Sequence, residues 1–212
     1  MQAIKAYTQI FPDFDGQEIL NKIERCGRVC YKSEGKIEED SAAKFVAGII
    51  KRGHEAVLEH ASVTVKFVVD RGVSHEIVSR EIVGHRLASY CQELQRYCNY
   101  SKDDFGSEIT FIIPEYLEYK SEGWNIWKSA MKSCEDAYFK MLDFGLSPEQ
   151  AGAVLPNSTK TELIMTADLR EWRTFFKLRC ANSAHPQMRE VTRPLLEDFK
   201  KLIPVIFDDI TY

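Results

Sequence analysis

Residues 74–101 bring together side chains that can bind anions and move protons. The stretch reads SHEIVSREIVGHRLASYCQELQRYCNYS, and His85 and Arg86 directly follow its apolar helical run. Arg96 lies ten residues beyond Arg86 in an expected polar loop. A guanidinium offers five donors in a planar fork, which suits a phosphate, a carboxylate or an imide edge. Two such groups in one loop could grip a nucleotide. The alternative is a solvated loop whose arginines pair with nearby glutamates.

A five-residue repeat lies in the same stretch, because SHEIV at 74–78 is followed at once by SREIV at 79–83. We expect one helix from Gly72 through both copies. Five residues along an α-helix turn its face by roughly 140° net, so the two copies present different faces. One copy is therefore a local addition.

Two further pairs of side chains are candidate metal ligands. His54 and His60 lie in GHEAVLEH, between an expected helix end and an expected strand, and Cys26 and Cys30 can share a helix face. Neither pair has a further ligand at zinc spacing. We therefore expect no metal site, with the histidines structural and the cysteines half-buried.

The helix expected over residues 169–179 has an aromatic face that ends in an arginine. Trp172, Phe175, Phe176 and Arg179 are spaced i, i+3, i+4, i+7. A guanidinium at that point is partly desolvated and needs a partner. The other cations of the helix, Arg170, Arg173 and Lys177, are expected to be solvated. After the helix, His185 precedes Pro186, where a histidine can meet an anion or cap the turn.

The elements that must position these residues are helices and strands in mixed order. Helices are expected over 15–31, 41–53, 72–83, 122–145, 147–156, 169–179 and 186–203, and strands over 2–8, 60–70, 107–114 and 159–167. Gly53 ends the second helix and Ser147 caps the fifth. The pattern predicts an α+β fold, a mixed sheet flanked by helices. Since no linker rich in Pro, Gly or Ser divides it, residues 1–212 form one expected domain.

Composition excludes several classes of protein. The net charge is −4 and the pI is about 5.8, which disfavours binding to nucleic acid. The N-terminus has no signal-peptide pattern and no apolar run is long enough for a membrane helix, so we expect a cytoplasmic protein with six reduced cysteines. Without a G-x-G-x-x-G, P-loop or G-x-S-x-G pattern, a standard dinucleotide fold, a P-loop NTPase and an α/β-hydrolase are not expected.

Several separate blocks of the chain resemble the flavin-dependent thymidylate synthases, in the right order. They are RGHEAVLEHASVTVKFVVDRGVSHE, HRLASY with the following QE, RYCNYSKDDFGSEITFIIP, AVLPN and LREWRTFFKLRCANSAHPQMREV. The resemblance covers about residues 26–209. It implies a homotetramer with active sites between subunits, FAD that NADPH reduces, and transfer of a one-carbon unit from methylenetetrahydrofolate to dUMP. It also implies no cysteine nucleophile, since the uracil ring is polarised electrostatically.

The resemblance assigns roles by position. On the flavin side it places His85, Arg86, Arg170 and His185, with His54 near the folate and flavin rings. On the dUMP side it places Glu81, Gln92, Glu93 and the phosphate ligand Arg96, and Gln92 also borders the flavin. Arg179 is the implied catalytic residue, because it grips the pyrimidine edge and favours the form ionised at N3.

Six site positions depart from the family pattern. Gly84 and Gly152 stand where arginines are usual, Leu94 where a serine is usual, Asp168 where an asparagine is usual, Thr174 where a histidine or asparagine is usual, and Ala56 where a serine or threonine is usual. A hydrogen bond to a charged group contributes about 1.5–3 kcal/mol, so the loss of two arginines and one hydroxyl contact could weaken binding about a thousandfold or more. Arg80, one helical turn before Gly84, is a possible replacement, and Arg80→Ala should then weaken flavin binding.

Three functions are compatible with this pattern. The first is a working or weakened flavin-dependent thymidylate synthase. The second is a non-catalytic or repurposed homologue that binds another nucleotide or serves as a structural partner of an active subunit. The third, binding of single-stranded nucleic acid, rests only on aromatic and arginine residues in one loop, and the acidic balance opposes it.

Overall fold

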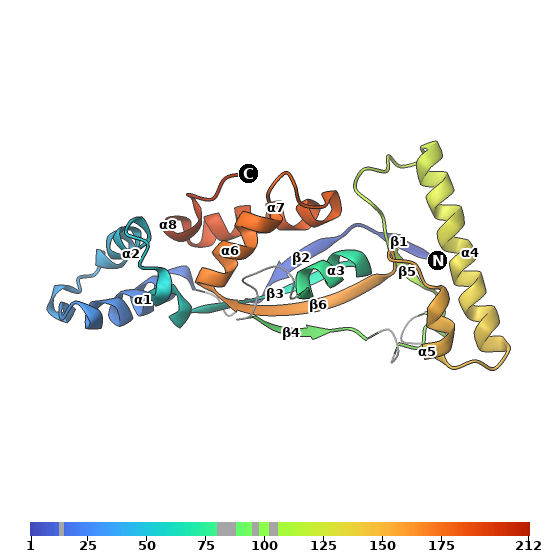
Figure 1. Ribbon diagram of the computed structural model, residues 1–212, viewed down its shortest axis with the longest axis horizontal. Coiled ribbons are helices and arrows are strands. Elements are labelled where there is room, and N and C mark those ends of the chain that lie inside the picture. The colour runs from blue at the N-terminus through green and yellow to red at the C-terminus, as the bar shows by residue number, and fades with distance from the viewer. Residues whose placement is uncertain (13–14, 80–87, 95–97, 102–105) are drawn as a thin grey trace. The chain divides into compact units, whose positions relative to one another are not determined.

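The computed structural model describes residues 1–12, 15–79, 88–94, 98–101 and 106–212 (Figure 1). Along the chain its elements are β1 (Gln2–Ile4), β2 (Tyr7–Ile10), α1 (Gly16–Cys30), η1 (Glu34–Lys36), α2 (Ser41–Lys51), η2 (Glu55–His60), β3 (Ser62–Asp70), α3 (Arg71–Val78), β4 (Ser89–Gln92), β5 (Thr110–Ile112), α4 (Glu122–Asp143), α5 (Pro148–Ala151), η6 (Gly152–Val154), β6 (Lys160–Asp168), α6 (Leu169–Arg179), α7 (Pro186–Leu202) and α8 (Pro204–Phe207). The predicted α+β class is confirmed.

The strands form two sheets. One pairs β1 with β5 in parallel, with Ala3 opposite Phe111, and the other has the order β2-β3-β6-β4. Strand β4 is a correction to the sequence prediction, which places residues 89–92 in a loop. Its sequence SYCQ is short and has no continuous apolar run, so only pairing with a distant strand reveals it.

The chain separates into two compact units, which are described in turn. One comprises Met1–Thr8, Lys66–Ser79 and Tyr90–Ile164, and the other comprises Gln9–Val65, Arg80–Ser89 and Met165–Tyr212. We call them the first and the second unit. The single domain predicted over 1–212 stays a prediction.

The first unit contains α4, whose N-terminal cap is Ser121, and α5 with its predicted cap Ser147. The Ser147 hydroxyl accepts from the Gln150 backbone N–H, and the Gln150 side chain accepts in return from the Ser147 N–H, which makes a complete capping box. The cluster that these helices cover contains Tyr100, Ile109, Phe111, Met131 and Tyr138. Apolar burial of this kind supplies the main driving force for folding.

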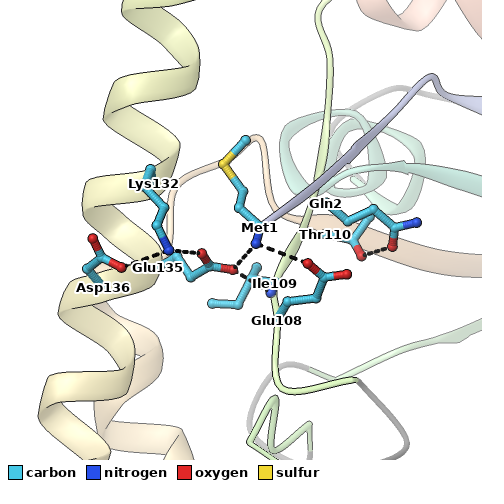
Figure 2. A network of polar contacts seen from close by, with 8 residues as sticks. All are labelled: Met1, Gln2, Glu108, Ile109, Thr110, Lys132, Glu135 and Asp136. Carbon is cyan, nitrogen blue, oxygen red and sulfur yellow. Dashed lines mark hydrogen bonds and ion pairs between the residues drawn. The ribbon is translucent and has the colours of Figure 1, made fainter.

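A polar network crosses this unit beside α4 (Figure 2). The amino group of Met1 lies 3.0 Å from both the Glu108 and the Glu135 carboxylates, and Glu135 also accepts from the Ile109 N–H at 2.8 Å. Lys132 completes the ring around Glu135 at 2.8 Å. Because Glu135 is 2% exposed, its charge is tolerated only with this set of donors.

Helix α3 is shorter than predicted. The Asp70 side chain caps its start by accepting from the Val73 N–H at 2.9 Å, and the helix ends at Val78. Ser79 follows in an extended conformation, with φ −62° and ψ 123°. The helix therefore ends between the two copies of the five-residue repeat, and the prediction of one helix through both copies was wrong. Apolar periodicity continues across Ser79, so it gave no signal for the stop.

The second unit is built around the aromatic stripe of α6. Trp172, Phe175 and Phe176 are fully buried, as predicted, and Phe176 packs against Phe199 of α7 with ring centroids 5.0 Å apart. Edge-to-face aromatic pairs of this kind add about 0.5–1.5 kcal/mol beyond the area that they bury. In Figure 1 this unit also shows α1 and α2 packed side by side.

One prediction for α6 was wrong, because Arg173 is buried rather than solvated. Its side chain is 2% exposed and forms two bonds of 2.6 and 2.7 Å with the Asp209 carboxylate. It also donates to the Ile206 carbonyl and lies 3.3 Å from Glu55. Burial alone would lower the pKa of Arg173, but the hydrogen bond and charge of Asp209 raise it overall. The C-terminal segment supplies this partner, and helix periodicity cannot report it.

Candidate functional site

The end of α2 fixes the backbone of His54. Gly53 takes the left-handed conformation, with φ 71°, as the predicted helix stop requires. The Gly53 N–H donates to the Ile50 carbonyl at 2.9 Å, and the His54 N–H donates to the Ile49 carbonyl at 3.1 Å. This is a Schellman motif, so His54 begins the next segment from a rigid point. Its ring Nδ1 lies 2.7 Å from the Tyr31 hydroxyl. Both His54 and the following Ala56 are exposed.

The start of α6 carries three of the predicted cofactor residues. The Asp168 carboxylate caps the helix by accepting from the Glu171 N–H at 2.8 Å, so the helix N-terminus partly balances its charge. Arg170 is half exposed, and its Nη1 lies 2.6 Å from Glu59. The Thr174 hydroxyl donates to the Arg170 carbonyl at 3.2 Å.

Helix α6 packs against the short helix η2 in the second unit. The Leu169 N–H donates to the Ala61 carbonyl at 3.0 Å, which joins the end of η2 to the start of α6. Two carboxylates of η2 then reach two arginines of α6, since Glu59 binds Arg170 and Glu55 binds Arg173. The predicted residues of η2 and of the start of α6 are thus brought onto packed neighbouring elements.

The far end of α6 carries Arg179, the predicted catalytic residue. It is 5% exposed, which confirms that the aromatic stripe ends in a desolvated guanidinium. Its backbone carbonyl accepts from the Thr192 hydroxyl at 3.0 Å, which ties the helix end to α7. A charged group that deep interacts strongly with any anion placed against it, because the local dielectric is low.

His185 lies at the N-cap of α7. Its Nδ1 accepts from the Gln187 backbone N–H at 3.3 Å, so the ring caps the helix while it remains exposed. Of its two expected roles, contact with an anion and capping of the turn, the structure shows the cap. The capping bond engages Nδ1 alone.

The predicted pyrimidine-side residues of the first unit lie at the end of β4. Gln92 belongs to the strand and not to a loop, and its Nε2 donates to the Ser74 hydroxyl at 2.8 Å. The Glu93 N–H donates to the Glu162 carbonyl at 2.9 Å, and the Glu93 carboxylate binds Lys160 at 3.0 Å. Leu94 follows and is 45% exposed.

A cavity of about 500 Å³ adjoins this strand end. Glu93, Lys160 and Tyr100 are among the residues that line it. The volume lies within the range of small-molecule pockets. A second cavity, of about 550 Å³, lies in the other unit beside the first turns of α1, and none of the predicted site residues that the structure describes lines it. Among the described residues, Glu93 is thus the predicted site residue that lines one of these two cavities.

The thiol beside Glu93 is not set up as a nucleophile. Burial raises the pKa of Cys98 to about 11, and the nearby Glu93 charge adds to the shift. The thiolate is the reactive form, so this cysteine stays a neutral thiol near pH 7. Lys160 stays charged, because Glu162 and Glu93 raise its pKa against the lowering effect of burial.

Of the remaining predicted positions, one belongs to the residues that the structure describes and five do not. Gly152 lies where α5 meets η6, directly after Ala151. Glu81, Gly84, His85, Arg86 and Arg96 lie outside the described residues, as does Arg80. Sequence reasoning missed Tyr31, Glu59 and Lys160, which contact predicted residues. No local pattern marks them, because each belongs to a different element from its partner and lies far from it in the sequence.

Comparison with known proteins identifies the chain. A family model described as thymidylate synthase complementing protein matches residues 16–205. The chain belongs to the flavin-dependent thymidylate synthase family. A flavin-dependent thymidylate synthase of Geobacter sulfurreducens is 35% identical over 189 residues, which cover 86% of this chain and 78% of the relative. Those of Pyrococcus furiosus and Pyrococcus abyssi are 36% and 35% identical, over 78% and 81% of this chain and 66% and 69% of the relatives.

The donors present in the second unit fit the flavin that family members use. Arg170 uses one Nη atom on Glu59 and is half exposed, so its guanidinium can still meet a phosphate. His54 and His185 present exposed imidazoles, and the Asp168 charge is already engaged with a helix N-terminus. Among the described residues no cluster suited to a metal ion is found, and none of their helices is long and apolar enough to cross a membrane.

Proposed function

We propose that this protein converts dUMP to dTMP with FAD, NADPH and methylenetetrahydrofolate. The observation that carries the proposal is the family match over residues 16–205, with relatives at about one-third identity over most of the chain. In this reaction C5 of the uracil gains a methyl group and loses its proton. The folate supplies the carbon at the methylene level, and bound reduced flavin supplies the hydride that completes the methyl group.

Arg179 is proposed to activate the uracil. A desolvated guanidinium beside the pyrimidine edge stabilises the ring when N3 is ionised, and this makes C5 more nucleophilic. Its 5% exposure supports the role, because the same charge in water would be screened. Gln92 and Glu93 are proposed to border the pyrimidine, together with Glu81 and Arg96.

Arg170, His54 and His185 are proposed to hold the flavin, with His85 and Arg86. A homotetramer is proposed to complete each site. The surface position of His54, Ala56 and Arg170 supports this, since a cofactor needs more cover than these exposed side chains give. A cytoplasmic location is part of the same proposal.

The test is direct. The purified protein is mixed with all four small molecules, and dTMP is measured by mass spectrometry while NADPH oxidation is followed with and without dUMP. Arg179→Lys should lower the rate at least tenfold, since a compact ammonium cannot make the bidentate contact. Arg193→Lys is the matched control, because this arginine binds the Cys180 carbonyl and Asn182 in the same unit.

A second function is favoured by the departures at Gly84, Leu94 and Gly152. If the wild-type protein binds neither FAD nor dUMP and forms no dTMP, the chain is a repurposed homologue. Binding of FAD and dUMP without dTMP formation would instead locate the defect in the chemical step, and the proposed activity would then be wrong.

A further inference from the structure

Two helix ends meet at an exposed pair of rings in the second unit. Helix α1 ends at Cys30, and the next residue, Tyr31, is its C-cap. Helix α2 ends at Lys51, and its cap Arg52 and the left-handed Gly53 lead directly to His54. The Tyr31 hydroxyl and the His54 Nδ1 lie 2.7 Å apart, and their rings are stacked with an interplanar angle of 17°.

The backbone on the Tyr31 side is fixed in the same way as on the His54 side. The Lys32 N–H donates to the Val29 carbonyl at 3.2 Å, and the Ser33 N–H donates to the Arg28 carbonyl at 3.2 Å. Lys32 has φ 48°, a left-handed conformation at a residue other than glycine. Both helices therefore end in Schellman motifs, and neither ring hangs on a free loop.

Packing between α1 and α2 holds the Tyr31 ring. The Tyr31 and Phe45 rings form an edge-to-face pair with centroids 6.5 Å apart, and the Arg52 guanidinium lies 6.0 Å from the centroid of the Tyr31 ring. The Phe45 ring in turn lies so close to Gly27 that a Cβ at that glycine would be 2.6 Å from it. The helices thus approach closely at this point, which sets the spacing between their ends.

The hydrogen bond decides which nitrogen of His54 carries the ring proton. The 2.7 Å contact fits either direction of donation, but a phenol is a good donor and an unprotonated imidazole nitrogen a good acceptor, which favours donation from the Tyr31 O–H to Nδ1. In the neutral ring the proton then belongs to Nε2. Within the described part of the chain Nε2 makes no hydrogen bond, and the His54 side chain is exposed.

The geometry points to Tyr31 as a positioning residue that fixes His54 as an Nε2–H donor for an acceptor atom of the bound cofactor. The complementary group is a ring carbonyl oxygen or an unprotonated ring nitrogen, which flavin and pterin rings both offer. The role in cofactor binding rests on the proposed function, whereas the assignment of the ring proton rests on the Tyr31 contact alone.

The first experiment measures the ring proton directly. Protein labelled with ¹⁵N at histidine is studied by long-range ¹H–¹⁵N NMR at about pH 8.5, where imidazoles are generally neutral. His54→Gln identifies the His54 signals. His185 is an internal standard, because its Nδ1 accepts a backbone N–H and its proton must lie on Nε2. The wild-type His54 shifts should match that pattern, and Tyr31→Phe should move them toward a mixture of the two forms.

The matched control is Tyr212→Phe. Tyr212 is 48% exposed, as Tyr31 is, and it also has a cation over its ring and a hydroxyl contact, in this case to Glu197. This variant should leave the His54 shifts unchanged. Wild-type shifts with the proton on Nδ1, or shifts that Tyr31→Phe does not move, would overturn the proposal.

The second experiment measures the affinity for FAD by quenching of flavin fluorescence. Tyr31→Phe should weaken binding roughly 2- to 10-fold, the range of one hydrogen bond, and Tyr212→Phe should not. A glutamine at position 54 keeps a donor near the Nε2 position without help from Tyr31, so Tyr31→Phe should have no further effect in the His54→Gln background. An equal effect in both backgrounds would overturn the positioning role. Failure of the wild-type protein to bind FAD would overturn the proposed function, and the nitrogen shifts would still decide the tautomer.

Discussion

Arg170 and Arg173 of α6 make a matched pair for testing how burial determines the contribution of an ion pair. We predict that Arg173→Met lowers the free energy of unfolding by about 2–4 kcal/mol, whereas Arg170→Met lowers it by about 0–1 kcal/mol. Both changes remove the same charge from the same helix. They differ in exposure, which is 2% for the Arg173 side chain and 50% for that of Arg170.

The magnitude follows from what each arginine leaves behind. Without Arg173 the Ile206 carbonyl loses its donor in a fully buried residue, which costs about 1–3 kcal/mol. Asp209 is 52% exposed and regains water, so the loss of its two charged bonds adds only a fraction of their gross strength. Glu59, the partner of Arg170, is 37% exposed and is likewise rehydrated.

The assay is urea denaturation with linear extrapolation, followed by far-UV circular dichroism. A second measurement uses pH. Arg173 lowers the pKa of Asp209 through its hydrogen bond, so this carboxylate stabilises the fold above about pH 4 and the contribution is lost as pH falls through the lower folded pKa. Arg173→Met should therefore lose less additional stability than the wild type on acidification below about pH 4. Equal losses in the two variants at neutral pH would refute the reasoning.

Three more predictions follow from single groups. Burial opposes both charges of the Met1–Glu135 contact, yet their hydrogen bonds lower the pKa of Glu135 and raise that of the Met1 amine. The contribution of the Glu135 carboxylate to stability is lost as pH falls below about 4.3, and that of the Met1 amine is lost as pH rises above about 8. The difference in urea midpoint between the wild type and Glu135→Gln should therefore be largest between about pH 5 and 7. Because the pKa of Cys98 is raised to about 11, this thiol should react with Ellman's reagent at about pH 8 far more slowly than the exposed Cys91, and equal rates would contradict its burial. Lys32→Gly should raise the free energy of unfolding by about 0.5–1 kcal/mol, because glycine adopts the left-handed backbone of this position without strain. Gly53→Ala should lower the free energy of unfolding by a similar amount for the opposite reason. Thermal melts in which both variants shift the melting temperature in the same direction would contradict this account.

Local signals predicted the elements well, and non-local contacts explain the failures. Gly53 and Ser147 mark helix ends through their own backbone or side-chain chemistry, and both were predicted correctly. Strand β4 exists because it pairs in the β2-β3-β6-β4 sheet, next to the Glu93–Glu162 contact, and nothing in its four residues requires a strand. Arg173 is buried because Asp209, 36 residues later, folds over it.

The candidate site was predicted unevenly for the same reason. The stripe that ends in Arg179 could be read from helical spacing, because its members share one face of the helix and that face is buried. The contacts of His54, Arg170 and Glu93 could not, since Tyr31, Glu59 and Lys160 come from other elements. A resemblance assigns a position its family role, but only the fold shows which neighbours hold the side chain there.

Arg170 and Arg173 of α6 differ in how their N–H donors are used. Arg173 places both Nη atoms on partners inside the unit, and its side chain is 2% exposed, so a ligand cannot reach its guanidinium without displacing these contacts. Arg170 spends one Nη atom on a half-exposed glutamate and keeps the rest of its fork at the surface. A bound phosphate can therefore add to Arg170 or replace Glu59 at little cost, because an exposed ion pair contributes at most about 1 kcal/mol. Sequence spacing treats the two residues as equivalent, but burial assigns Arg173 to stability and leaves Arg170 at the surface, where we propose that it contacts the cofactor.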